Sequence, residues 1–205
     1  MLYRIAHIIR DGMPWLWDGL TAVLSLFFRL RYGRRLEKLS GYLQAGNPFY
    51  LNGEELRVER LSADNTTALA KMFSEQPEEA FAFFRPHGFL KEDLDKLAKD
   101  SGFLAFVVSC RGSVVGYFFQ RSYFWGKSYR GYITDYRWRR RGVNTFMNVC
   151  ATEISAILGL RAYGTISPEN TASMSSAKKA NDVEIVKTLA NGDYLVEYLP
   201  KKVVP

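Results

Sequence analysis

The pattern of hydrophobic and polar positions divides the chain into an apolar N-terminal stretch and a longer part with mixed patterns. Residues 15–30 are mostly apolar, and their polar side chains gather on one narrow helical face. Pro14 suits a first helical turn and Gly33 a helix end. The pattern therefore predicts an amphipathic helix with a very wide apolar face. Its length of about 24 Å is shorter than the bilayer core, which disfavours a membrane-spanning helix.

The rest of the chain follows a connector marked by Gly46-Asn47-Pro48 and Asn52-Gly53. Alternating apolar positions there predict a first strand at residues 56–61. Further strands are expected at residues 103–110, 113–119, 129–135, 161–166, 183–189 and 194–199. Helical spacing predicts helices through residues 62–73, 77–99 with a break at 86–88, 146–158 and 168–180. This order indicates an α+β fold, a mostly antiparallel sheet with helices on both sides. We expect a helical arm over residues 1–48 and one domain over residues 49–205.

One helix and one hairpin of that domain carry their own boundary signals. Ser62 and Asp64 are candidate N-terminal caps for the helix that ends near Phe73. Arg111-Gly112 is a candidate two-residue turn of a hairpin.

The environment of the N-terminal helix, residues 14–38, has two interpretations. It lacks the features of a secretory signal, because Asp18 interrupts it and arginines follow it. The helix either packs on protein (the domain, a second copy in a homodimer or a partner) or lies in a membrane interface. In the second case, Arg31, Arg34 and Arg35 would be near anionic headgroups on the inner face of the membrane.

Composition excludes several classes of protein. With 47% hydrophobic and 15% aromatic residues, the chain is not expected to be disordered. Cys110 and Cys150 lie in apolar runs and predict reduced core thiols in a cytoplasmic protein. The histidines are His7 and His87, and no Cys/His cluster has metal-ligand spacing, so we expect no metal.

The net charge of +7 raises nucleic acid as a partner, but the charge is localised. Residues 1–48 contain seven basic and three acidic side chains, and residues 136–142 contain four arginines and no acid. A nucleic-acid-binding protein using residues 137–141 is therefore kept only as a less favoured alternative.

The second basic patch links a strand to a helix through Thr134-Asp-Tyr-Arg-Trp-Arg-Arg-Arg-Gly-Val-Asn-Thr145. A helix start presents unpaired N–H groups and the positive end of the helix dipole, which attract anions. Gly142 lets a phosphate approach the backbone. The order of strand, basic turn, glycine and helix predicts a phosphate-bearing ligand, with a solvated basic turn as the alternative.

Two segments resemble the GNAT acetyltransferases. Residues 139–144, Arg-Arg-Arg-Gly-Val-Asn, resemble the family's Arg/Gln-x-x-Gly-x-Gly/Ala pyrophosphate loop, and residues 170–181 resemble its later Asn-x-x-Ser/Ala helix. The likeness covers about residues 55–199. It implies a GNAT-like sheet, acetyl-CoA as cosubstrate, and acyl transfer to an amine or hydroxyl without a covalent enzyme intermediate.

The resemblance also implies which residues bind acetyl-CoA. N–H groups of Arg140 to Thr145 would hold the pyrophosphate, main-chain groups around Thr134 and Tyr136 the pantetheine arm, and Asn170 and Ser173 the thioester end. The full set is Thr134, Tyr136, Arg139, Arg140, Arg141, Gly142, Val143, Asn144, Thr145, Asn170 and Ser173.

The chain departs from the family pattern at three places. Asn144 replaces a small residue, so its side chain must point away from the phosphates or donate to them. Asn181-Asp182 replaces Gly-Phe. Ala177 stands where many members have a tyrosine that protonates the leaving thiolate, so Tyr132 becomes our candidate acid, with Tyr136 as the alternative.

A weaker resemblance links Pro86-His87 to acetyltransferases of surface polysaccharides or nucleotide sugars. It implies a sugar acceptor, with His87 as a general base that titrates near neutral pH. Asp135 is an alternative base, and a structural role in the helix break is the alternative for His87. A non-catalytic acyl-CoA-binding module remains the rival function.

Overall fold

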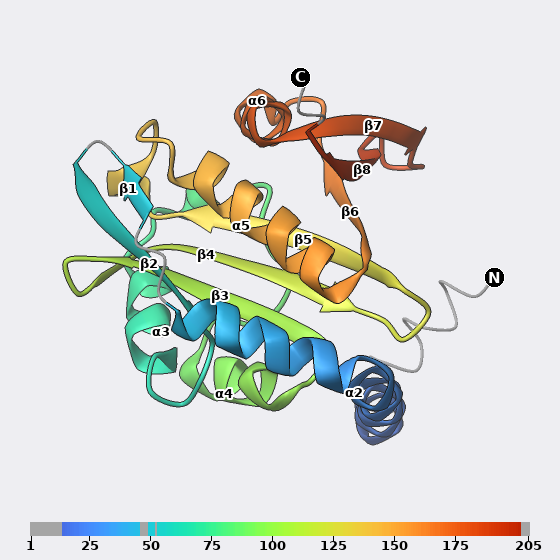
Figure 1. The fold of residues 1–205 in the computed structure, drawn as a ribbon. Helices are drawn as coiled ribbons and strands as arrows, with labels where there is room; N and C mark the ends of the chain where they lie inside the picture. Colours follow the sequence, from blue (N-terminus) through green and yellow to red (C-terminus); the bar gives the residue numbers. More distant parts are fainter. Residues whose placement is uncertain (1–13, 46–48, 52, 202–205) are drawn as a thin grey trace.

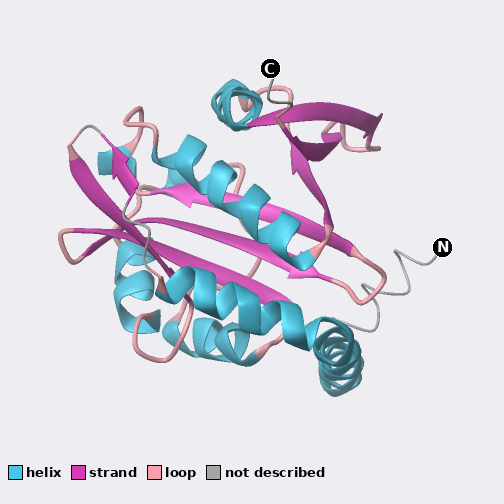
Figure 2. Ribbon diagram, viewed as in Figure 1, coloured by secondary structure: helices cyan, strands magenta, loops and turns pink. Residues whose placement is uncertain are grey.

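A computed structural model describes residues 14–45, 49–51 and 53–201, with only the backbone for residues 14–18. The described residues form one eight-stranded sheet in the order β1-β2-β3-β4-β5-β6-β8-β7 (Figures 1 and 2). Every neighbouring pair is antiparallel except β5 and β6. The predicted α+β fold with a mostly antiparallel sheet is confirmed.

The strands and helices have the following bounds. The strands are β1 (Phe49–Leu51), β2 (Glu54–Arg60), β3 (Phe103–Cys110), β4 (Ser113–Ser122), β5 (Lys127–Thr134), β6 (Arg161–Ile166), β7 (Asn181–Thr188) and β8 (Tyr194–Pro200). The helices are α2 (Pro14–Gln44), α3 (Thr66–Ser74), α4 (Lys91–Lys99), α5 (Val143–Leu158) and α6 (Thr171–Ala180), with short 3-10 helices at Glu78–Phe81 and Tyr136–Trp138.

Several boundary signals act as expected. Arg111 and Gly112 have φ values of 48° and 77°, which the tight turn between β3 and β4 requires. Gly159 ends α5 with a φ of 66°. The connector signal at Gly46-Asn47-Pro48 and at Asn52 lies outside the described residues. Gly53 has a φ of 82° in the turn between β1 and β2.

The predicted caps of α3 are wrong. The helix begins at Thr66, after Asn65, and neither Ser62 nor Asp64 caps it. The reason is a turn closed by Asn65, whose side chain accepts from the Ser62 N–H at 3.0 Å and donates to the Arg60 carbonyl at 3.0 Å. The region after Pro77 forms only one short 3-10 turn before α4.

Helix α2 also differs from its prediction, because it continues through Gly33 to Gln44. Tyr32 and Leu39 are both buried, so packing on either side of the glycine favours an uninterrupted helix over the local signal. Figure 1 shows the helix bending between its darkest, N-terminal part and the part beside α5. The second half of the predicted arm therefore packs on the domain.

The sheet has a core on each face. Phe28, Tyr32 and Leu39 of α2 join α5 and the side chains of Phe106 and Phe118 in one cluster. The other face packs against α3 and α4. Its cluster contains Leu69, Phe73, Leu94, Val107, Tyr117 and Phe119. Alternate residues of β3 and β4 thus serve opposite cores, as the two-residue period of a strand requires.

Leu39→Ala should destabilise the protein by about 2–5 kcal/mol, because it leaves a cavity where α2 meets the core. Leu20→Ala, on the same helix but 46% exposed, should change the stability by less than about 0.5 kcal/mol. Urea unfolding of both variants measures the difference. Equal losses of stability in the two variants would show that Leu39 does not contribute to the core as its burial indicates.

Candidate functional site

Strands β5 and β6 diverge after a short stretch of pairing. Lys127–Tyr129 pairs in parallel with Arg161–Tyr163, but β5 continues to Thr134 and β6 to Ile166 without further pairing between them. The β6-facing backbone groups of β5 beyond Tyr129 therefore have no strand partner within residues 53–201. Such an edge can hydrogen-bond an extended ligand in the way an added strand would.

Buried polar atoms without partners lie on one side of this divergence. They are Tyr132 Oη, Thr134 Oγ1, Asn148 Oδ1 and Arg130 Nε, none of which has a hydrogen-bond partner in the described structure. The first two and Arg130 alternate along β5, and Asn148 lies on α5, which covers this face. Because nearly all buried polar atoms in proteins are hydrogen-bonded, this cluster is the kind of surface a polar ligand completes.

Arg130 is a buried cation, and no carboxylate contacts it among the described residues. Its guanidinium donates to Thr152 Oγ1 at 2.9 Å and to Ser155 Oγ and the Ala151 carbonyl at 2.8 Å each, and it lies 5.0 Å from the centre of the Tyr198 ring. Burial raises the pKa of Tyr132 and the charge of Arg130 opposes that rise. The Tyr132 phenol is therefore protonated at neutral pH, with a cation placed to stabilise its phenolate.

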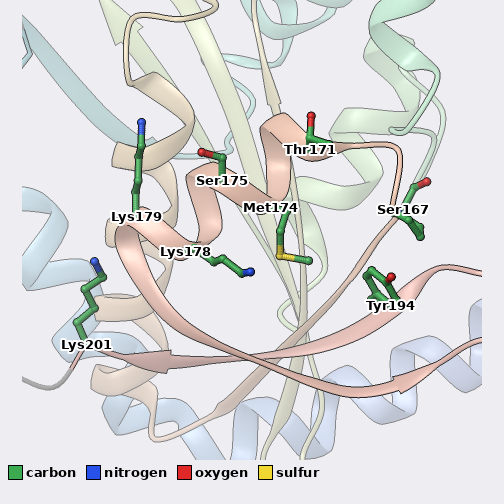
Figure 3. A pocket seen from close by; sticks show the side chains of 9 residues that line it. Ser167, Thr171, Met174, Ser175, Lys178, Lys179, Tyr194 and Lys201 are labelled. Carbon is green, nitrogen blue, oxygen red and sulfur yellow. The ribbon is translucent and has the colours of Figure 1, made fainter.

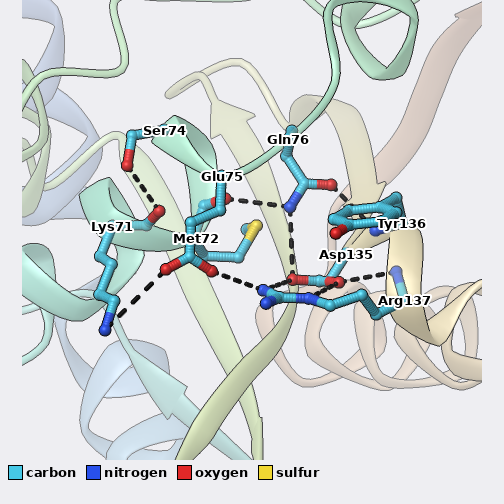
Figure 4. Close-up of polar contacts among 8 residues, drawn as sticks. All are labelled: Lys71, Met72, Ser74, Glu75, Gln76, Asp135, Tyr136 and Arg137. Atoms are coloured by element: carbon cyan, nitrogen blue, oxygen red, sulfur yellow. Dashed lines mark hydrogen bonds and ion pairs between the residues drawn. The ribbon is translucent and has the colours of Figure 1, made fainter.

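The end of β5 is held by Asp135, which is fully buried (Figure 4). Its carboxylate accepts the Arg137 N–H at 2.8 Å, the Arg137 side chain at 3.0 and 2.7 Å, and Gln76 Nε2 at 3.3 Å. Burial raises the pKa of Asp135, but the bonds from Arg137 outweigh it and the pKa lies below its ordinary value. This carboxylate is saturated with donors, which argues against it as a general base.

The same contacts limit what the basic turn can offer a ligand. Arg137 also pairs with Glu75 at 2.7 Å, so its charge is neutralised. The Tyr136 N–H donates to Gln76 Oε1 at 2.9 Å, so a role for Tyr136 rests on its other groups. Arg139 and Arg140 are exposed and have no partner among the described residues, whereas Arg141 lies 4.9 Å from the centre of the Trp138 ring.

Gly142 begins α5 in a left-handed conformation, with a φ of 90°. Arg140, two residues earlier, also has a positive φ, of 62°. The first N–H groups of α5, from Val143 onward, have no intrahelical acceptor, as at any helix start, and no side chain caps them. A strained turn thus presents free N–H groups and the positive end of the α5 dipole beside two unpaired arginines.

The remaining cofactor candidates are placed as follows. Val143 is buried, so only its backbone is available. The Asn144 side chain accepts from Asn148 Nδ2 at 2.9 Å, which turns it along α5 and away from the turn. Thr145 is half-buried. Asn170 caps α6 by accepting the Ser173 N–H at 3.1 Å, so both residues first stabilise the helix start.

His87 lies in an aromatic cluster on the opposite face of the sheet from Tyr132. Its Nδ1 is 2.6 Å from the Gly88 carbonyl, which can only accept, and its Nε2 is 3.0 Å from the Tyr117 hydroxyl. Burial lowers the pKa of His87, more than the Gly88 bond raises it. The ring is therefore neutral, and both of its nitrogens are engaged. His87 and Tyr132 lie on opposite faces of the sheet, so the structure does not bring these two predicted catalytic residues together.

Helix α6, which has alanine and not tyrosine at position 177, contacts α5 through Asn181. Ala177 is buried, and Asn181 after it donates to the Ala177 carbonyl at 3.2 Å and accepts from the Thr152 hydroxyl. Sequence reasoning missed Arg130, Asn148 and Gln76. The signal for Arg130 was its two-residue spacing from Tyr132 and Thr134, which places all three on one face.

A cavity of about 550 Å³ lies on another face of α6 (Figure 3). Thr171, Met174 and Lys178 line it from one side of the helix, with Tyr194 of β8 opposite. Ala177 and Asn181, by contrast, face α5 and β6. This cavity is therefore separate from the divergence of β5 and β6.

No protein-family model and no curated protein matches the chain, but solved structures do. The GNAT domain of S. lividans PAT is 13% identical with a TM-score of 0.66, over 76% of this chain and 97% of that one. PaiA N-acetyltransferase from Thermoplasma acidophilum, in complex with coenzyme A, is 12% identical with a TM-score of 0.60, over 70% and 98%. Mycobacterium smegmatis RimJ, in complex with CoA-disulfide, is 14% identical with a TM-score of 0.61, over 78% and 88%. The predicted GNAT fold is confirmed.

Asp135→Asn should destabilise the protein at neutral pH, by an amount that shrinks as the pH falls. The pKa of Asp135 is lower in the folded protein than in the unfolded chain. Its stabilisation is therefore complete above the unfolded value of about 3.9 and is lost as the pH falls through the folded value. Urea unfolding at several pH values measures this dependence.

Glu75→Gln is the matched control, because it removes the exposed partner of the same Arg137 guanidinium. It should cost at most about 1 kcal/mol. If the difference between wild type and Asp135→Asn stayed constant down to acid pH, Asp135 would not be the charged anchor of the turn.

Proposed function

We propose that this chain, which has the GNAT fold, is an acyl-CoA-dependent acyltransferase that uses acetyl-CoA and an amine or hydroxyl acceptor. One observation carries the proposal. The divergence of β5 and β6, with its unpartnered buried polar atoms, ends at the strained Gly142 turn and the free N–H groups of α5. A ligand with an extended polar arm and a phosphate end would satisfy both.

The proposed binding mode assigns the phosphate end to the turn. The N–H groups from Arg140 to Thr145 would hold the pyrophosphate, assisted by Arg139. The pantetheine amides would pair with the free β5 edge near Thr134, whose buried hydroxyl has no partner. Acetyl-CoA supplies an activated acyl thioester, and two of the three solved structures described above contain coenzyme A or CoA-disulfide.

Tyr132 is the proposed general acid. It would replace the tyrosine that many GNAT members have where this chain has Ala177. Its buried hydroxyl is unpartnered, and burial keeps its pKa raised, so the proton is available. Donation to a leaving thiolate would leave a phenolate beside Arg130, whose charge stabilises it. A proton donor needs both properties: it must be protonated before transfer and stabilised after it.

The acceptor is proposed to be a sugar, reaching the thioester from the opposite face of the sheet. Tyr129 of β5 and Tyr163 of β6 lie there with ring centres 5.8 Å apart, where the two strands begin to diverge. Tyr163 is buried, but the Tyr129 ring is 39% exposed and offers an apolar surface with a hydroxyl at its edge, which suits a ring-shaped polar acceptor. His87, on this face, would act as a base only by releasing Tyr117, so its geometry supports a structural role better.

Gly142→Val should abolish CoA binding, because valine at a φ of 90° forces the turn to change and reorients the N–H groups that follow. Its Cβ would also lie 3.2 Å from Leu51 Cδ1. Gly192→Val is the matched control, with a φ of 87° and no atom within 4 Å of the added Cβ. Both variants should lose about 1–3 kcal/mol of stability, and only the first should lose CoA affinity by titration calorimetry. Unchanged affinity of Gly142→Val would remove the proposed phosphate site.

Tyr132→Phe should lower turnover by about 10²–10⁴-fold while leaving the dissociation constant for CoA nearly unchanged. The assay is release of the CoA thiol from acetyl-CoA in the presence of a panel of amino sugars. Tyr50→Phe, which removes an exposed phenol on β1 outside the proposed site, should keep its turnover. Equal effects of the two changes would contradict the role of Tyr132. CoA binding without any thiol release by the wild type would favour the non-catalytic module.

A further inference from the structure

We propose that α2 docks this protein on an anionic lipid surface through its exposed apolar side chains. We call these the outer face of α2: Leu20, Val23, Leu26, Phe27 and Leu30, which are 46–72% exposed. Their spacing of mostly three or four residues places them along one side of the helix. An exposed group of large apolar side chains of this kind marks an interaction site.

The outer face is exposed because the domain packs against a different side of α2. Ser25, on the narrow polar stripe, hydrogen-bonds to Asp100 of the domain, and Phe28 and Tyr32 are buried. Part of the polar stripe therefore faces protein, and most of the wide apolar side faces outward. The domain leaves the outer face of α2 without a partner among the described residues, apart from its contact with the β4–β5 turn.

That turn extends the apolar surface beyond the helix. The Phe27 ring lies 5.8 Å from the Phe124 ring, which lies 5.1 Å from that of Trp125. Trp125 is itself 48% exposed. Tryptophan has an apolar body with one polar N–H, and it is enriched where hydrocarbon meets headgroups. Two separate elements thus contribute to one apolar surface.

The charges around this surface select anionic lipid as its occupant. Residues 19–44 contain five basic side chains and one acid, Glu37. Arg29, Arg31 and Arg34 are exposed within a few residues of the outer face. Long basic side chains on an apolar helix can reach headgroups while the apolar side chains enter the acyl boundary.

A second copy of the chain fits this surface less well. Two copies would bring the same arginines together, and like charges facing each other oppose association. Charged residues are also depleted in the cores of protein interfaces, whereas here they alternate with the apolar side chains. No helix in the described part of the chain has the length and hydropathy needed to cross a bilayer, so the proposed contact is with the surface.

Docking through this face leaves the proposed phosphate site open. The β4–β5 turn, which meets Phe27, is at the end of β5 opposite to the Gly142 turn. Figure 1 shows the N-terminal part of α2 at one end of the sheet and the beginning of α5 at the other. In a docked molecule, the divergence of β5 and β6 would thus stay open to solvent or to a membrane-attached acceptor.

The test is sedimentation of the full chain with vesicles of phosphatidylserine and phosphatidylcholine, and with vesicles of phosphatidylcholine alone. The protein should pellet with the anionic vesicles, and high salt should weaken the association. Leu26→Glu with Leu30→Glu should abolish it. Ile185→Glu with Val186→Glu is the matched control, because these β7 side chains are 54% and 50% exposed and lie on another element; it should still pellet. Arg29→Gln and Arg34→Gln should each weaken binding about fivefold, the equivalent of about 1 kcal/mol per charge.

Three results would overturn the proposal. Wild type that stays in the supernatant with anionic vesicles at low salt excludes lipid as the occupant. Equal losses in the two glutamate pairs exclude the outer face of α2 as the contact. A dimer in light scattering that Leu26→Glu with Leu30→Glu dissociates assigns the face to a second copy. CoA titration of every variant keeps this proposal separate from the acyltransferase function, since none of these residues belongs to the proposed cofactor site.

Discussion

The central constraint on this structure is that β5 and β6 pair over only three residues before they separate. Their separation depends on α6, which packs on β6 and β8 through Ala162, Ile166 and Val196 and is joined to α5 by the contact between Asn181 and Thr152. In this arrangement β6, with β8 and β7 beyond it in the sheet, leaves β5 after Tyr129. The free strand edge, the unpartnered polar atoms and the exposed start of α5 all follow from that arrangement.

Two buried charges on β5 and just after it show how this region differs from an ordinary core. Asp135 receives compensating bonds from Arg137 and Gln76, as a buried carboxylate must. Arg130 has only neutral partners within the described chain, and its Nε has none. A buried cation without a counter-charge is costly for folding, so it is best explained by a task at the site. Stabilising negative charge that develops near Tyr132 is such a task.

Local sequence signals predicted the elements well where they coincide with packing. The apolar run of β3, the Arg111-Gly112 turn and the glycine that ends α5 all coincide with elements that neighbours in sequence determine. They failed at Gly33, where the burial of Tyr32 and Leu39 outweighs a helix-end signal, and at α3, where a turn made by Asn65 displaces the expected caps. The Gly142 turn was predictable because strand, glycine and helix are contiguous. The partners of Arg130 were not, since they come from α5, and neither was the contact of Gln76 with Asp135, since Gln76 lies just after α3. The two faces separating His87 from Tyr132 emerge only once the strands pair.

Hydrogen–deuterium exchange of the full chain, with and without acetyl-CoA, tests the central claim most directly, because it reports each backbone amide at the free edge. The account predicts slower exchange in two segments on binding, residues 130–134 of β5 and residues 140–145 at the start of α5. Amides of β3, which are already paired on both sides, should not change. Saturating acetyl-CoA that leaves both segments unprotected, or that protects the cavity beside Met174 and Tyr194 instead, would contradict it.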